Sequence, residues 1–163
     1  MAQQANDKSS EYEKLEIKKI LIAIDKSGYK QKIIAYTITL AKSLGASVTI
    51  IHVLDKASLG VVGNMVGFYR GGMSDEYEKV VKKQAEDLLN ETKDLLEKEG
   101  VRTSTAVVVK SSSAEGIIDY ANETGADLIV IGTKGLTGVG KFLMGGVANA
   151  VIGHAHCPVL AVR

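Results

Sequence analysis

A glycine-rich stretch over residues 132–148 has the composition of an anion-binding loop. It holds six glycines, and it lies between an apolar run over residues 128–131 and the apolar positions of a short helix. Glycines leave backbone N–H groups unhindered, and this order places those groups at the carboxyl end of a strand and beneath a helix N-terminus. An α/β protein usually holds a phosphate there. The stretch therefore predicts phosphate binding.

Two common nucleotide motifs fit these glycines poorly. Residues 135–141 match the G-x-x-x-x-G-K pattern of a Walker loop, but Phe142 stands where a serine or threonine hydroxyl should bind magnesium, and the loop starts three residues late after the fourth predicted strand. A dinucleotide fingerprint would need a third glycine where the chain has Leu143, and it would follow the first strand instead. A third interpretation rests on the wider spacing of the glycines.

That spacing is Gly132-x-x-Gly135, then nine residues, then Gly145, with a strand ahead and a helix behind. In this arrangement the chain resembles the universal stress protein family, and the resemblance covers residues 18–163. It is carried by four segments: Ile22-Ala-Ile-Asp25, Ile51-His-Val53, Ala126-Asp-Leu-Ile-Val-Ile-Gly-Thr-Lys-Gly135 and His156-Cys-Pro-Val-Leu-Ala-Val162.

The resemblance implies an adenine nucleotide site, for ATP or AMP, with or without a magnesium ion. In ATP-binding members the end of the first strand borders the adenosine, and the glycines let the backbone close around ribose and phosphates. Lys134 and Lys141 add positive charge to the loop, and the helix start adds N–H groups. The expected site residues are Ala23, Ile24, Asp25, Val53, Gly132, Lys134, Gly135, Gly145, Gly146 and Val147.

Two small residues depart from the family pattern. Gly146 and Ala148 stand where ATP binders often carry hydroxyl groups that contact phosphate. A hydrogen bond to a charged group is worth about 1.5–3 kcal/mol, so losing both could weaken phosphate binding about a hundredfold or more. Two hypotheses follow: a stress-response regulatory protein that binds an adenine nucleotide, and a nucleotide-free homodimeric interaction module of the same fold.

Other reactive residues do not assemble into a predicted catalytic or metal site. His154, His156 and Cys157 include two imidazoles and a thiol, but no fourth ligand is evident, and histidines suit the negative end of a helix dipole. His52 lies inside an apolar strand and is expected to be a hydrogen-bonded core histidine. No nucleophile, base and orienting group can be combined, so we predict that the protein is not an enzyme and has at most slow ATP hydrolysis.

The elements that must position the site follow from hydrophobic periodicity. Strands are predicted over residues 20–24, 48–53, 103–109, 128–131 and 158–162, and helices over 28–45, 74–100, 112–125 and 147–154. This alternation predicts one doubly wound α/β domain with a parallel sheet in the order 3-2-1-4-5, of the adenine nucleotide alpha hydrolase-like type. Asp25 and Asp55 end strands on the ligand side, where each can contact a ligand or cap a turn.

Two helices carry specific local predictions. Ser112 and Glu115 match a capping box, and Gly125 is placed to end the same helix. The helix over 74–100 has one apolar stripe on the side expected to face the core. The stripe comprises Tyr77, Val80, Val81, Ala85, Leu88, Leu89, Thr92, Leu95 and Leu96. The glycine-rich, apolar insertion over 56–73 is either a connector on the domain body or a flap over a ligand or partner surface.

Composition limits the remaining possibilities. The 163 residues suit one domain, here residues 18–163 after a flexible polar tail over 1–17, and the formal charge of +1 implies no nucleic-acid partner. No apolar run is long enough to cross a bilayer, the start lacks a signal peptide, and a single cysteine suits a reducing compartment, so we expect a cytoplasmic protein without a membrane partner. The weakly charged fifth strand predicts a homodimer through its edge; a further protein partner is unknown.

Overall fold

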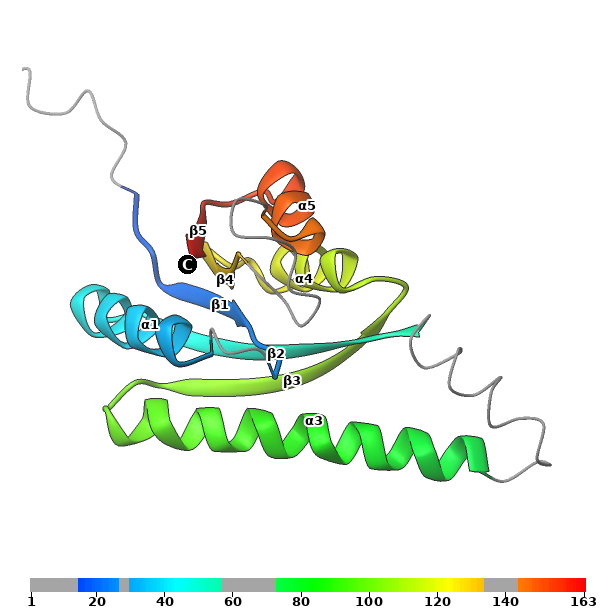
Figure 1. Ribbon diagram of the computed structural model, residues 1–163. Coiled ribbons are helices and arrows are strands. Elements are labelled where there is room, and N and C mark those ends of the chain that lie inside the picture. Colours follow the sequence, from blue (N-terminus) through cyan, green and yellow to red (C-terminus); the bar gives the residue numbers. More distant parts are fainter. Residues whose placement is uncertain (1–14, 27–29, 57–72, 134–143) are drawn as a thin grey trace, which may run out of the picture.

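The computed structural model describes residues 15–26, 30–56, 73–133 and 144–163. Strands and helices alternate along the chain, as predicted (Figure 1). The tail before residue 15 and most of the insertion lie outside the described residues, so the predictions for these two segments stay predictions. The elements are β1 (Lys19–Ala23), α1 (Lys30–Leu44), β2 (Ser47–Asp55), α3 (Met73–Lys98), β3 (Thr103–Lys110), α4 (Ser113–Thr124), β4 (Leu128–Gly132), α5 (Gly146–His154) and β5 (Val159–Val162).

The five strands form one parallel sheet in the order β3-β2-β1-β4-β5, which confirms the predicted topology. β1 is central, because Ala23 is level with Ile51 of β2 on one side and with Ile131 of β4 on the other. The chain leaves β1 towards β2 and later returns to place β4 on the opposite side of β1. The direction of winding therefore reverses between β1 and β4, and a crevice opens at their carboxyl ends.

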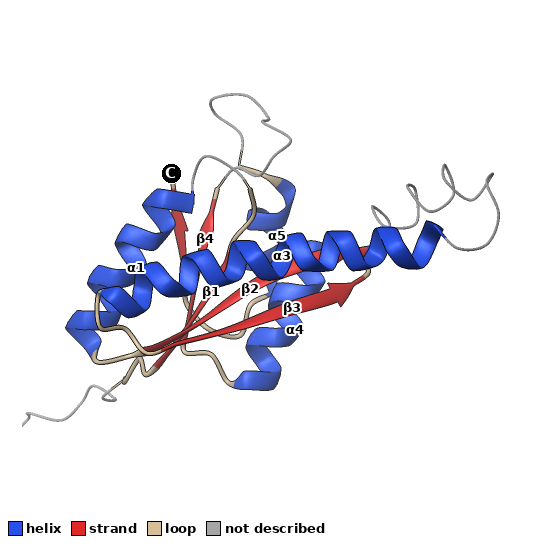
Figure 2. Ribbon diagram, turned by 90° about the horizontal axis from the view of Figure 1, so that it is seen from below, coloured by secondary structure: helices blue, strands red, loops and turns tan. Residues whose placement is uncertain are grey.

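Helices cover both faces of the sheet (Figures 1 and 2). α1 and α3 pack on one face, where Ile20 and Ile22 of β1 join their core cluster. α4 and α5 cover the other face, and Leu21 of β1 points into that second cluster. Alternate side chains of one strand thus enter two cores. This is why β1 reads as an uninterrupted apolar run rather than an alternating one.

The predicted apolar stripe of α3 is only partly buried. Ala85, Leu88, Leu89, Thr92 and Leu96 are buried, whereas Tyr77, Val80 and Leu95 are 36%, 49% and 46% exposed. The helix has 26 residues, about 39 Å of length, while β3 beneath it has 8 residues and spans about 26 Å. The amino-terminal turns therefore extend beyond the strands, as Figures 1 and 2 show. Helical periodicity alone was wrong about the extent of the buried face.

Helix ends follow the local signals. Ser112 is the N-cap of α4, and its side chain accepts a hydrogen bond of 3.2 Å from the backbone N–H of Glu115, which is the serine half of the predicted capping box. Gly125, predicted to end α4, has a φ of 62°, and Gly45, directly after α1, has a φ of 65°; both values are in the left-handed region that favours glycine at a helix end. Among the described helices, none combines the length and the apolarity needed to span a bilayer.

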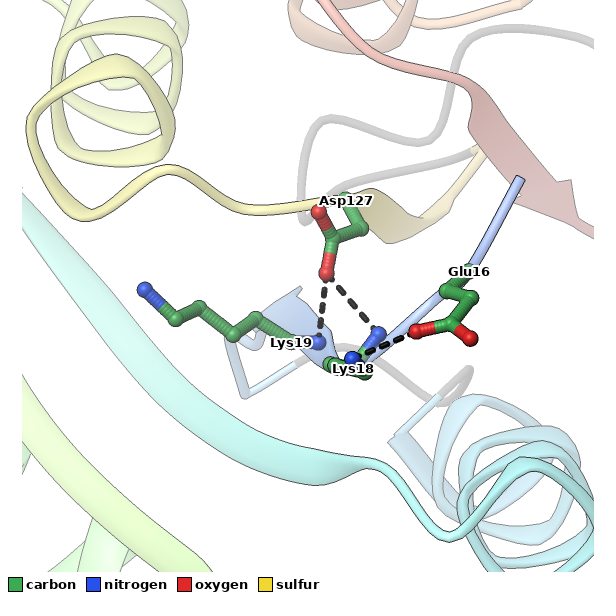
Figure 3. Close-up of polar contacts among 4 residues, drawn as sticks. All are labelled: Glu16, Lys18, Lys19 and Asp127. Carbon is green, nitrogen blue, oxygen red and sulfur yellow. Dashed lines mark hydrogen bonds and ion pairs between the residues drawn. The ribbon is translucent and has the colours of Figure 1, made fainter. Parts of the chain in front are cut away.

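Asp127 joins the start of β1 to the turn before β4 (Figure 3). One of its carboxylate oxygens accepts hydrogen bonds of 2.8 Å from the backbone N–H groups of both Lys18 and Lys19. The Lys19 ammonium group donates to the carbonyl of Thr124 at 3.0 Å, and Glu16 forms an ion pair with Lys18 that raises the pKa of this lysine. These contacts align β1 and β4 at their amino ends. Because β1 and β4 are paired in register, the same alignment fixes the relative positions of their carboxyl ends at the crevice.

Candidate functional site

A cavity of about 140 Å³ lies at the carboxyl ends of the central strands. It is roughly ten times larger than a single buried water requires, so a small molecule can enter it. Eight of the ten predicted site residues line the cavity, while Lys134 and Gly135 lie outside the described residues. The lining comprises Ala23, Ile24, Asp25, Ile33, His52, Val53, Ser113, Ile117, Ile131, Gly132, Thr133, Gly145, Gly146, Val147 and Ala148.

Strand register explains why residues far apart in sequence meet here. β1, β2 and β4 are parallel neighbours, so their carboxyl ends share one edge of the sheet. The N–H of Ile24 donates to the carbonyl of Ile51 at 3.0 Å, which keeps the chain beside β2 for one more residue after β1 ends. Asp25, the next residue, lines the cavity. The described ends of the glycine segment, Gly132 and Gly145, line the same cavity, as predicted.

The N-terminus of α5 forms one wall of the cavity. Gly145 is the N-cap, its own N–H donates to the carbonyl of Thr133 at 2.8 Å, and its carbonyl accepts the first helical hydrogen bond from Asn149 at 3.1 Å. The N–H groups of Gly146, Val147 and Ala148 precede that first bond and have no partner within the helix. In the described part of the chain no side chain caps this helix. Three backbone donors and the positive end of a helix dipole thus border the cavity.

Gly146 and Ala148 differ in how they border the site. Among the residues that the structure describes, a Cβ added to Gly146 would meet no atom within 4 Å, and Gly146 is exposed. Ala148 is 1% exposed and packs into the protein. The start of α5 therefore offers a ligand its backbone, and there is room for a larger side chain at position 146 but not at position 148.

Thr133 is a lining residue that the sequence analysis missed. Its N–H donates to the carbonyl of Val162 in β5 at 2.9 Å, and its carbonyl accepts from Gly145. Thr133 is 5% exposed, so this pair of bonds ties the edge strand and α5 together inside the protein. Its position directly after Gly132 was the available signal. The other missed lining residues are Ile33, His52, Ser113, Ile117, Ile131 and Ala148.

His52 behaves as the predicted hydrogen-bonded core histidine, and it also lines the cavity. Its Nδ1 lies 2.8 Å from the carbonyl oxygen of Ile24. A carbonyl only accepts hydrogen bonds, so Nδ1 carries the proton and donates. This bond holds the imidazole against the backbone that leads to Asp25, which gives His52 a structural role at the site.

The residues near the C-terminus have ordinary local roles. Nδ1 of His154 lies 2.9 Å from the carbonyl of Ala150, one turn earlier in α5. Burial, with a smaller contribution from Asp127, raises the pKa of the Cys157 thiol. Within the ranges that the structure describes, no group of three His, Cys, Asp or Glu side chains is arranged to hold a metal ion.

Comparison with known proteins bears on the whole chain. Residues 16–163 match the model of the universal stress protein family. A universal stress protein of Methanocaldococcus jannaschii is 35% identical over 146 residues, which cover 90% of this chain and 82% of that protein. The structure of universal stress protein UspA from Lactobacillus plantarum has a TM-score of 0.76 at 20% identity, with 92% of this chain and 100% of that chain covered.

A further solved neighbour is a universal stress protein from Archaeoglobus fulgidus in complex with dAMP, with a TM-score of 0.62, 24% identity, and 91% of this chain and 100% of that chain covered. The family match spans all five strands described above, and the archaeal relative matches most of the chain above 30% identity. The chain therefore belongs to the universal stress protein family.

Proposed function

We propose that this protein binds an adenine nucleotide, ATP or AMP, in the cavity between β1 and β4. The observation that carries the proposal is the start of α5, where the backbone N–H groups of Gly146, Val147 and Ala148 border the cavity without a partner in the helix. Such donors, together with the helix dipole, favour a phosphate group. We propose the same contact between the phosphate and the start of α5 whether or not Mg²⁺ accompanies the nucleotide.

The apolar part of the cavity lining suits a nucleoside. Side chains from β1, β2 and α4 contribute to it, among them Ala23, Val53 and Ile117. Asp25 also lines the cavity, and its carboxylate oxygens can accept hydrogen bonds from ribose hydroxyls. The dAMP complex of the Archaeoglobus fulgidus neighbour supports the proposal, because it shows this fold with an adenine nucleotide bound.

The arrangement favours binding over chemistry. Ser113 and Thr133 are the hydroxyl residues among the described cavity residues, and neither hydroxyl is hydrogen-bonded to a base there. A serine or threonine nucleophile needs such a base. We therefore propose a regulatory protein of the stress response that changes its surface when nucleotide binds, and that hydrolyses ATP slowly at most. Lys134 and Gly135 remain proposed contacts.

The open edge of the sheet favours a second candidate, a homodimeric interaction module that works without nucleotide. Among the described strands β5 pairs only with β4, and its residues Val159, Leu160 and Ala161 are half-buried and uncharged. An edge of this kind suits pairing with a second copy across a two-fold axis. The absence of hydroxyls at Gly146 and Ala148 also favours this candidate. The proposed homodimer belongs to both functions.

The two candidates are separated by measuring nucleotide directly. Freshly purified protein is denatured, any released nucleotide is identified by mass, and the refolded or untreated protein is titrated with ATP and with AMP by calorimetry, with and without Mg²⁺. Release or titratable binding of adenine nucleotide supports the first function. No binding of either nucleotide up to millimolar concentration would contradict it. Sedimentation at micromolar concentration tests the dimer, and a monomer would contradict the proposed β5 interface.

A further inference from the structure

Helix α4 lies unusually close to the sheet at Gly116. A Cβ added there would be 2.6 Å from Cγ1 and 3.0 Å from Cγ2 of Val53, and 3.4 Å from Cβ of Lys110. Carbon atoms in contact prefer about 3.5–4.0 Å, so any side chain at position 116 would overlap Val53. The φ of Gly116 is not positive, and glycine inside a helix is destabilising relative to alanine. The reason for this glycine is therefore the close approach itself.

The same contact forms part of the cavity wall. Ser113 and Ile117 are four residues apart, so they share one face of α4, and Gly116 lies within the same turn. Ser113, Ile117 and Val53 all line the cavity. Because position 116 carries no side chain, the methyl groups of Val53 can lie close to α4. The missing side chain therefore determines how far Val53 projects into the cavity.

α4 is held in place on both sides of Gly116. Ile117 and Ala121 are 3% and 0% exposed in the core under the helix. The ammonium group of Lys110 lies 2.6 Å from a carboxylate oxygen of Asp119, a contact that raises the pKa of this lysine and joins the end of β3 to α4. Moving the helix outward would disturb these contacts. Val53 is half-buried beside open space, so an added methyl group at position 116 is expected to push Val53 into the cavity.

We propose that Gly116 is a positioning residue that sets the width of the apolar wall at Val53 and so lets the site accept a flat heterocyclic base. This inference rests on the proposed function and extends it: the N-terminus of α5 holds phosphate, and the contact of α4 with β2 selects ligands that carry a base. A ligand made of phosphate alone makes no use of this wall.

Three variants of the full chain test the proposal: Gly116→Ala, Val53→Ala and the double variant. Each is titrated by calorimetry with ATP and with inorganic triphosphate, and folding is checked by circular dichroism and thermal melting. Gly116→Ala is expected to weaken ATP binding about tenfold and to leave triphosphate binding within about twofold. In the double variant, the methyl group added at position 116 occupies the space vacated by the Val53 methyl groups, so ATP binding is expected to return to within about threefold of wild type.

Two results would overturn the inference. The first is a folded Gly116→Ala protein that binds ATP as wild type does, or that loses triphosphate and ATP to the same degree. The second is an equal ATP affinity of Val53→Ala and the double variant, because this result would show that position 116 has no influence on binding. This second comparison can be made even if Gly116→Ala alone does not fold. A wild-type protein that binds no ATP would refute the proposed function instead, and it is measured first.

Discussion

Replacing Gly146 by serine restores a hydroxyl group at the start of α5. The position is suited to the change because an added Cβ meets no atom of the described residues within 4 Å and the residue is exposed at the cavity. The neighbouring departure, Ala148, is a poorer choice. It is 1% exposed, and a threonine there would overpack the protein. The single substitution at Gly146 therefore isolates the contribution of one hydroxyl.

The expected gain is that of one hydrogen bond to a charged phosphate. Such a bond contributes about 1.5–3 kcal/mol, which corresponds to an increase of about 10- to 150-fold in ATP affinity. The backbone N–H groups of α5 contribute to binding in both proteins, so they cancel in the comparison. The lower end of the range is expected if the hydroxyl must give up a well-ordered water molecule to reach the phosphate.

Calorimetric titration with ATP measures the gain, and two control variants separate the hydroxyl from the rest of the side chain and from its place in the helix. Gly146→Ala adds the Cβ and the helix propensity of a larger residue without the hydroxyl. Gly153→Ser adds a serine at another glycine of α5, which does not line the cavity and where a Cβ also meets no atom within 4 Å in the described part of the chain. If Gly146→Ser binds ATP no more tightly than Gly146→Ala, the phosphate does not lie at the start of α5 and the reasoning is wrong.

Three further predictions concern stability and reactivity. Leu89→Ala should lower the free energy of unfolding by about 2–5 kcal/mol and Leu95→Ala by under about 1 kcal/mol, because these two leucines are 2% and 46% exposed. Equal shifts of the urea midpoint in the two variants would contradict the observed packing of α3. Asp127→Asn should destabilise the protein by about 1–3 kcal/mol, because its hydrogen bonds to the N–H groups of Lys18 and Lys19 become weaker. Glu16→Gln removes only an exposed ion pair and should change the urea midpoint little. A wild-type urea midpoint for Asp127→Asn would refute the role of this carboxylate in aligning β1 and β4. Burial and then Asp127 raise the pKa of Cys157, so its alkylation should be slower than that of a free cysteine at pH 8 and should speed up in Asp127→Asn. The raised folded-state pKa also means that protonated Cys157 stabilises the fold at neutral pH and that this contribution is lost as the pH rises through the folded-state pKa, a loss that Cys157→Ser abolishes.

Local patterns were sufficient for much of the fold. Uniform apolar runs such as residues 20–24 indicated strands covered on both faces, and two separate core clusters now account for them. Ser112 and Gly125 marked the ends of α4 through interactions within a few residues of the chain, so no knowledge of the tertiary structure was needed. The reversal of strand order follows from the alternation of elements, and it is sufficient to bring Asp25 and the glycine segment to one crevice.

Contacts between distant parts of the chain decided the rest. Periodicity assigned Leu89 and Leu95 of α3 to one apolar stripe, but Leu95 lies at the edge of that stripe and is exposed although Thr92 and Leu96 beside it are buried. At the other end of the helix Val80 is exposed because α3 is longer than β3. Thr133 gained its role only when Val162 and Gly145 came within hydrogen-bonding distance. Gly116 carried no sequence signal at all, because the methyl groups of Val53 that exclude a side chain there belong to a strand more than 60 residues earlier. The sequence by itself determined the family, the sheet and the place where the two ends of the glycine segment meet, since these follow from local patterns and spacing. Only the tertiary structure decided the shape of the cavity wall, since that shape depends on how closely distant elements pack.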